Sequence, residues 1–167
     1  MAIITGDFAT RLSGGAANAV GNSALGGAKS SNTAGTTVDS LFDAVSAAQA
    51  AAGLIEYRCV YLHNSNATSS MINAVVYVSA NTPLAGTTID IGVGTAAING
   101  TEQTIANEAT APTSVTFSAP TTAGTGLSLG TIPAGQHIAI WIRRTVTAGS
   151  GSSTSDTFTL GYQCETA

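Results

Sequence analysis

The amino-acid sequence predicts an all-β protein, folded as a single β-sandwich of seven to eight strands with an extended N-terminal arm. Three observations support this prediction: short segments rich in β-branched and aromatic residues recur along the chain, turn-forming residues separate them, and sustained helical periodicity is almost absent. The chain of 167 residues is long enough to bury a core without disulfides or metal. The pattern leaves open whether the strands connect as in an immunoglobulin-like fold or as in a jelly roll.

Residues 1–38 are predicted to form the arm, and residues 39–167 the β-sandwich domain. The arm is rich in Gly, Ala and Ser, and its large apolar side chains are too sparse to close a core. This composition is typical of a disordered tail. The other interpretation is an extended arm whose isolated hydrophobic residues, Ile3, Ile4 and Phe8, dock on a neighbouring subunit.

The segment after the arm, DSLFDAVSAAQAAAG, predicts a strand followed by a short helical turn that ends at Gly53. The next strand, at about 55–63, has apolar side chains in both phases, which indicates a central strand covered on both faces. Residues 95–113 show no sustained period and predict a long loop or an edge excursion. The remaining strands are predicted at about 71–79 and in the segments TTIDIGVG, SVTFSAP, GLSLGTIPAG, QHIAIWIRRTV and DTFTLGYQCE.

The chain's only tryptophan lies beside two arginines in the strand HIAIWIRRTV. Ile138, Ile140 and Ile142 share one phase and should face the core, which places Trp141 and Arg143 together on the other face. One interpretation is that Trp141 covers the outer face of the sheet with an arginine stacked nearby. The other is a protein–protein contact, because Trp and Arg are enriched at binding hot spots.

Charge and hydropathy exclude several classes of protein. Only 8% of the residues are charged, and the formal net charge is -4. The five Lys and Arg residues are too few and too scattered to neutralise nucleic-acid phosphates. Apolar runs fall short of the roughly 18 residues of a membrane helix, and the N-terminus does not match a signal peptide. We therefore expect synthesis in a cytosol, with no nucleic-acid partner and no membrane.

The sequence patterns also argue against catalysis. His63 and His137 are expected at strand ends, without Asp, Glu or Cys at ligand spacing. A G-x-S-x-G nucleophile elbow is absent, and GNSALGGAKS differs from a phosphate-binding loop in spacing and context. We expect no enzymatic activity, no cofactor, no metal and no small-molecule substrate.

Two cysteines, Cys59 and Cys164, lie far apart in predicted strands. In a cytosolic protein they should remain reduced and buried. The alternative is a disulfide between Cys59 and Cys164 across the sandwich, which would close a loop of about 100 residues.

Three blocks of the sequence resemble a group of small virion structural proteins of tailed bacteriophages. The blocks are EYRCVYLHN, NAVVYVS and G-(x)2-PAG-(x)5-WIRRTV-(x)-AG, within a similarity over roughly residues 40–165 that leaves out the arm. The resemblance implies a non-enzymatic β-sandwich located in the virion, expected to act as a capsid decoration or cement protein. Its expected partners are the major capsid protein and copies of itself.

A protein of this kind would use surface side chains as contacts, and we expect these to be Trp141, Arg143, Ile3, Ile4 and Phe8. An alternative from the same composition is a tail, neck or fibre component whose sandwich binds host-surface glycan. An exposed Tyr or Trp at a loop tip would favour that alternative.

Overall fold

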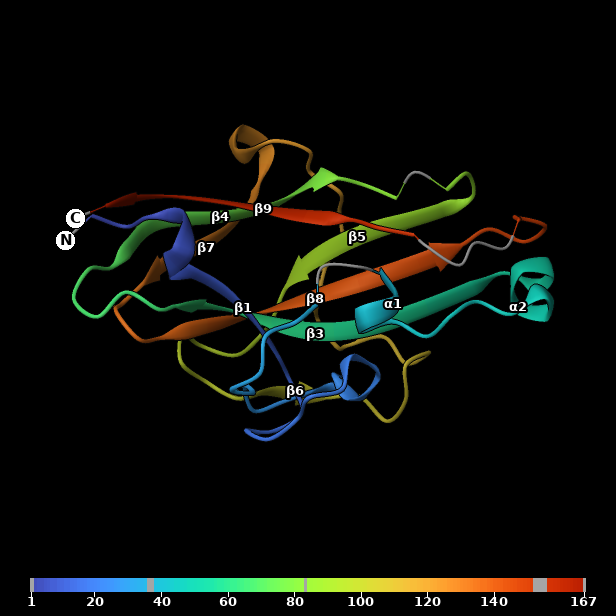
Figure 1. The fold of residues 1–167 in the computed structure, drawn as a ribbon, viewed down its shortest axis with the longest axis horizontal. Helices are drawn as coiled ribbons and strands as arrows, with labels where there is room; N and C mark the ends of the chain where they lie inside the picture. The colour runs from blue at the N-terminus through green and yellow to red at the C-terminus, as the bar shows by residue number, and fades with distance from the viewer. Residues whose placement is uncertain (1, 36–37, 83, 152–155, 167) are drawn as a thin grey trace.

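The computed structural model describes residues 2–35, 38–82, 84–151 and 156–166. These residues form nine strands in three antiparallel sheets with a few short helices, so the prediction of an all-β sandwich is confirmed. The predicted count of seven to eight strands is too low, because the short β2 and β6 pair as well. Figure 1 shows the two larger sheets running along the long axis, with both ends of the chain at the same end of the sandwich.

The four-stranded sheet has the order β1-β3-β8-β5, the three-stranded sheet has the order β7-β4-β9, and β2 and β6 form a small pair. The strands are β1 (Phe8–Leu12), β2 (Gly26–Gly27), β3 (Leu54–Asn64), β4 (Met71–Ala80), β5 (Thr87–Val93), β6 (Glu102–Thr104), β7 (Leu127–Ile132), β8 (His137–Val146) and β9 (Thr159–Thr166). The helices are α1 (Val38–Leu41), α2 (Ala47–Ala52) and the short 3-10 helices η1 (Thr5–Asp7), η2 (Gly21–Ser23) and η3 (Ala123–Thr125).

The main core lies between the two larger sheets. The predicted inward phase of β8 is confirmed, because Ile138, Ile140 and Ile142 all belong to this core. The three-stranded sheet contributes Val76 and Val78 from its central strand, β4. The period-2 alternation along each strand produces this arrangement, since successive side chains point to opposite faces of a sheet.

A second apolar cluster covers the other face of the four-stranded sheet. Its buried members come from β3, β8 and the segment that crosses them: Tyr57, Cys59, Tyr61, Ile105, Ala139 and Trp141. The covering segment is the long loop predicted at residues 95–113, which includes β6, and its continuation to residue 118. In Figure 1 it lies below the four-stranded sheet. β3 is therefore covered on both faces, as its two apolar phases predict.

The predicted N-terminal arm differs from the structure. β1 pairs with β3 along its whole length, and Leu12, Ala24 and Ala34 are buried in the main core. The small residues in this region allow main-chain segments to lie close to one another. Gly26, at φ +92°, lies so close to the main chain of β6 that a side chain would collide with the carbonyl of Gln103. A composition typical of disorder therefore folds, because its glycines admit backbone contacts that larger residues would block.

Two strand predictions are wrong. Residues 38–41 form α1, and Phe42 lies completely buried beside it in the main core. The predicted helical turn is confirmed as α2. The hydroxyl of Ser46 accepts a hydrogen bond from the backbone N–H of Gln49 and so caps its start, and the helix ends at Gly53. The segment SVTFSAP forms no strand and makes one isolated bridge, between Ser118 and β5.

Candidate functional site

The structure makes Trp141 inaccessible to a partner. Its side chain is 0% exposed and lies in the second cluster, beneath the segment around Ile105 and Phe117. The prediction of Trp141 as a contact residue is therefore wrong, whereas its packing on the outer face of the sheet is correct. The reason is that residues 95–118 of the same chain cover this face of the sheet.

Arg143 lies at the surface but is held by its own chain. Its guanidinium is 2.7 Å from the carboxylate of Asp90 on β5 and stacks over the ring of Phe117, with its central carbon 5.1 Å from the ring centroid. The predicted arginine stacking thus involves Phe117. The role of Arg143 as a partner contact stays a prediction.

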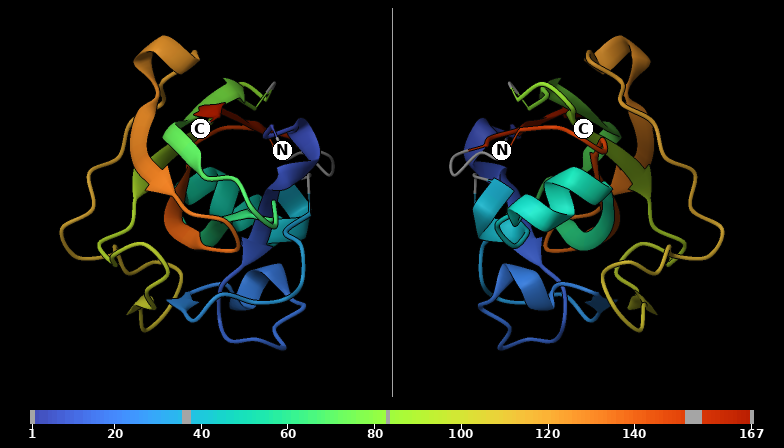
Figure 2. Two further views of the ribbon diagram at one scale, coloured as in Figure 1. Left: turned by 90° about the vertical axis from the view of Figure 1, so that its left-hand side faces the viewer. Right: turned by 90° about the vertical axis from the view of Figure 1, so that its right-hand side faces the viewer.

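The other three predicted contact residues lie together. Ile3, Ile4 and Phe8 line one open groove of about 370 Å³ with Thr5, Tyr162, Gln163 and Cys164. Ile4 is 64% exposed, and the ring of Phe8 stacks on that of Tyr162 at a centroid distance of 6.0 Å. Figure 2 shows the N-terminal segment beside β9 here, where the amide of Ile3 donates to the hydroxyl of Thr166.

A second hollow continues from this groove along β9. It is a cavity of about 140 Å³ between β1 and β9, lined by Thr10, Ala34, Gly35, Leu41, Val60, Ile142, Phe158, Thr159, Leu160 and Tyr162. Tyr162 belongs to both hollows, and neither is lined by a charged residue. We call the groove and the cavity together the β1–β9 seam. The sequence did not reveal the seam, because it forms only where two strands distant in sequence meet at an open side of the sandwich.

The hydroxyl of Tyr162 is the polar link across the seam. It lies 3.0 Å from the hydroxyl of Thr10 on β1, and burial raises the pKa of Tyr162 to about 12. The folded protein therefore favours the neutral phenol, whose ordinary pKa is about 10. The stability contributed by this difference is fully present below about pH 10 and is lost as the pH rises through about 12.

We expect a spectrophotometric titration to show phenols that ionise only near pH 12, because burial also raises the pKa of Tyr61 to about 12. Tyr162→Phe should reduce the amplitude of this late phase by about half, and unfolding in urea should move the phase to about pH 10. A late phase of unchanged amplitude in Tyr162→Phe would contradict the burial of this hydroxyl.

Carboxylates flank the apolar groove. Burial together with the nearby charges of Asp7 and Glu165 raises the pKa of the Cys164 thiol. The alternative of a Cys59–Cys164 disulfide is contradicted, since both thiols are free. Cys59 lies in the second cluster on the outer face of the four-stranded sheet, whereas Cys164 lies on β9 in the other sheet. Burial raises the pKa of Cys59 strongly, which keeps it as an inert thiol.

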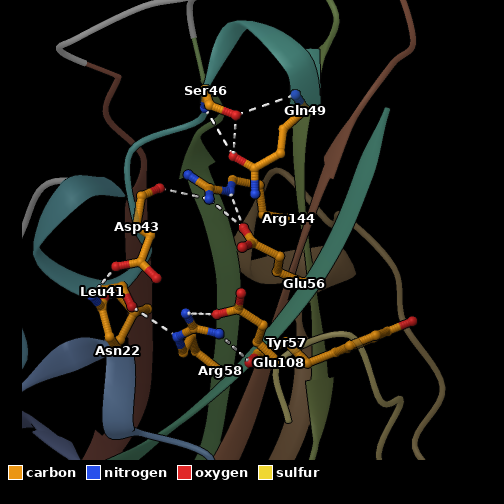
Figure 3. A network of polar contacts seen from close by, with 10 residues as sticks. All are labelled: Asn22, Leu41, Asp43, Ser46, Gln49, Glu56, Tyr57, Arg58, Glu108 and Arg144. Atoms are coloured by element: carbon orange, nitrogen blue, oxygen red, sulfur yellow. Dashed lines mark hydrogen bonds and ion pairs between the residues drawn. The ribbon is translucent and has the colours of Figure 1, made fainter. Parts of the chain in front are cut away.

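A network of ion pairs lies around β3 and β8, with Arg58, Arg144 and Glu56 buried and Glu108 partly exposed (Figure 3). Arg144 pairs with Glu56 and also donates to the carbonyl of Asp43, while Arg58 pairs with Glu108 at 2.5 Å. Sequence reasoning missed this network, although Glu56 shares its strand phase with the core residues Val60 and Leu62, which was the available signal.

The ring of Phe42 packs against both arginines of the network. The central carbon of the Arg58 guanidinium is 5.2 Å from the ring centroid, and that of Arg144 is 4.7 Å from it. Arg58 also donates to the carbonyl of Leu41 at 3.0 Å. The network thus fastens the loop between α1 and α2 to β3 and β8. Because each arginine is engaged by a carboxylate and by main chain, its geometry is that of a structural support.

The two histidines lie close to each other. His63 and His137 stand opposite each other on β3 and β8, with ring centroids 6.5 Å apart. Within the part of the chain that the structure describes, there is no cluster of three or more His, Cys, Asp or Glu side chains able to hold a metal ion. None of the helices formed by the described residues has the length and apolar character needed to cross a membrane.

Comparisons with protein-family models, with curated proteins and with solved structures find no match to this chain. The class that the fold and the site define is an all-β sandwich protein with an uncharged, partly open seam between two of its edge strands.

Proposed function

We propose that this chain is a non-enzymatic structural protein of a bacteriophage particle, a capsid decoration or cement protein that binds the major capsid protein. The sequence blocks that resemble virion structural proteins of tailed phages support the proposal. The structural observation that carries it is the exposed side chain of Ile4, which shares one open apolar groove with Ile3 and Phe8. An exposed apolar groove on a domain with few charges is typical of a protein contact surface.

The proposed mechanism is avidity. Each copy buries about 800 Å² on its partner, and many copies bridge neighbouring capsid subunits, so that tight binding of a single copy is not required. We expect copies of the protein to associate with one another as well, because cyclic oligomers match the symmetric positions of a capsid. The protein is then located in the virion after synthesis in the host cytoplasm.

The first test is quantitative band densitometry of purified particles, before and after mild chaotrope treatment. We expect many copies per particle, in a fixed ratio to the major capsid protein, and particles that lose DNA when this band is removed. A few copies per particle would move the protein to the tail or neck and overturn the capsid proposal.

Rebinding to stripped particles tests the surface itself. Ile4→Asp should lower rebinding by about tenfold or more, because it places a charge in the centre of an apolar contact. Val20→Asp is the matched control, since Val20 is another exposed apolar residue, at 55%, outside the β1–β9 seam. Equal rebinding of both variants would remove the groove from the proposal.

The alternative of a glycan-binding tail or fibre sandwich lacks a specific observation in its favour. Stacking on sugar rings uses exposed aromatic side chains. All four tyrosines and the single tryptophan lie within strands β3, β4, β8 and β9, so that none occupies a loop tip. Densitometry separates this alternative from the capsid proposal.

A further inference from the structure

The four outer strands of the two larger sheets differ in how their free edges are covered. Main chain at residues 30–34 hydrogen-bonds to β1, and Ser118 exchanges two hydrogen bonds with Ile91 on β5. β7 itself carries an extra residue, Leu129, between the pairs Ala74–Gly130 and Val75–Ser128, and has Gly130 at φ +72°. The β4–β9 ladder also shifts register, but its extra residues lie on β4 and leave β9 regular. Among the residues that the structure describes, none donates or accepts a main-chain hydrogen bond at the free edge of β9.

This edge is unusual for a protein that remains unassociated. Natural sheets protect exposed edges with Lys, Pro, bulges or a covering segment, because unpaired N–H and C=O groups invite another strand. Residues 159–166, TLGYQCET, contain neither Lys nor Pro. At the end of the strand the main-chain amide of Ile3 donates to the hydroxyl of Thr166.

The hydrogen-bond pattern shows which residues point their main chain out of this edge. Val78 on β4 stands opposite Leu160, and its N–H donates to the carbonyl of Pro120 at 2.7 Å, away from β9. In an antiparallel ladder, opposed residues either exchange both hydrogen bonds or both point away from each other. Leu160 therefore points its N–H and C=O to the free edge. Tyr162, two residues further on with no register shift between them, does the same.

Leu160 and Tyr162 also line the cavity of the β1–β9 seam with their side chains. Main-chain groups lie in the plane of a sheet and side chains stand perpendicular to it, so one strand residue can offer both. At about 140 Å³ the cavity is close in volume to an engineered apolar cavity of about 150 Å³ that binds benzene. One large apolar side chain fits a hollow of that size.

We propose that β9 accepts an added strand from a partner: an extended segment that hydrogen-bonds to the main chain of Leu160 and Tyr162, inserts one large apolar side chain into the seam and carries a flanking Lys or Arg. Strand addition of this kind takes affinity from main-chain hydrogen bonds and specificity from pockets for alternate side chains. The inference rests on the proposed function for the identity of the partner and names the chemistry of its contact.

Electrostatics supports a basic flank. The hollows themselves are lined by uncharged residues, and the charges that act on Cys164 beside them are the carboxylates of Asp7 and Glu165. An acidic segment would be repelled here, whereas a Lys or Arg near the end of the added strand would be attracted.

The test is a selection of random twelve-residue peptides, displayed on yeast, against the full chain. Enriched peptides should alternate apolar and polar residues, contain Phe, Leu or Ile, and carry Lys or Arg. When a synthetic version of an enriched peptide binds, hydrogen exchange of the amides of Leu160 and Tyr162 should slow by about tenfold or more. Exchange of the Gly161 amide, which bonds to β4, should change little. This readout needs no variant.

Two variants at one position separate main-chain from side-chain contributions. Leu160→Ala shortens the side chain and keeps the N–H, whereas Leu160→Pro also removes the N–H that points out of the edge, where proline is tolerated. We expect the peptide to bind Leu160→Pro about tenfold more weakly than Leu160→Ala. Circular dichroism establishes that both variants are folded.

Several outcomes would overturn the inference: no enriched peptide, enriched peptides that are acidic, or equal binding of the two variants. A wild-type dimer in sedimentation velocity that Leu160→Pro dissociates would assign the edge to a second copy instead. Because the selection uses no phage particle, its failure is distinguishable from failure of the capsid proposal, which the rebinding of Ile4→Asp decides.

Discussion

Replacing Arg144 with Ala is expected to lower the free energy of unfolding by about 3–5 kcal/mol, because it leaves the buried carboxylate of Glu56 without its partner. The side chains of Arg144 and Glu56 are 3% and 1% exposed, and Arg144 also donates to the carbonyl of Asp43. The substitution thus removes an ion pair and a fastening of the loop between α1 and α2. Urea unfolding followed by circular dichroism measures the loss.

Arg143→Ala is the matched control, since it lies next along the same strand. Its ion pair with Asp90 is partly exposed, at 32% and 19% for the two side chains, so its removal should cost less than about 1 kcal/mol. Similar losses in the two variants would contradict the assignment of Arg144 to the interior. Replacing both members of the buried pair by apolar residues, Glu56→Leu with Arg144→Met, should recover much of the lost stability.

The effect of Arg144→Ala should also depend on pH. Burial raises the pKa of Glu56, and the nearby Arg144 opposes that rise. Without the arginine the folded pKa rises further, so folding favours protonated Glu56. The variant therefore gains stability relative to wild type as the pH falls through this raised pKa, and its deficit is largest at neutral pH. A deficit independent of pH would exclude Glu56 as the cause.

Trp141→Ala is expected to destabilise the protein by about 3–5 kcal/mol, through loss of apolar burial and the cavity left behind. Trp141 is 0% exposed and packs with Cys59 and Ala139 beneath the segment 95–118. We expect the segment to loosen with it, and limited proteolysis should cut the variant within residues 95–118 while wild type resists. Circular dichroism must follow unfolding, because the chain has no other tryptophan.

Trp141→Phe is the control that keeps an aromatic ring in the cluster, and it should cost clearly less than Trp141→Ala. In the wild-type protein the fluorescence of this tryptophan should be blue-shifted and insensitive to aqueous quenchers until the protein unfolds. Ready quenching of the native protein would show that the covering layer is open in solution, which would return Trp141 to the candidates for a partner contact.

Strand patterning was the most informative part of the sequence. The inward phase of β8 follows from the alternation of Ile138, Ile140 and Ile142, and the two apolar phases around Cys59 indicate a strand covered on both faces. These properties are predictable because side-chain direction in a strand is set by the local backbone. The strand predicted around Phe42 failed, since a buried aromatic residue fits a strand or a loop equally well and tertiary packing decides between them.

The sequence by itself determined the all-β class, the faces of the central strands, the scarcity of charge and the helical turn that ends at Gly53. Only the tertiary structure decided what covers each face: it buries Trp141 under its own chain and joins Ile3, Ile4 and Phe8 with β9. The physical reason is that strand periodicity is a local property of the backbone. A covering layer or an open seam depends instead on contacts between segments far apart in sequence, whose pairing no local pattern encodes.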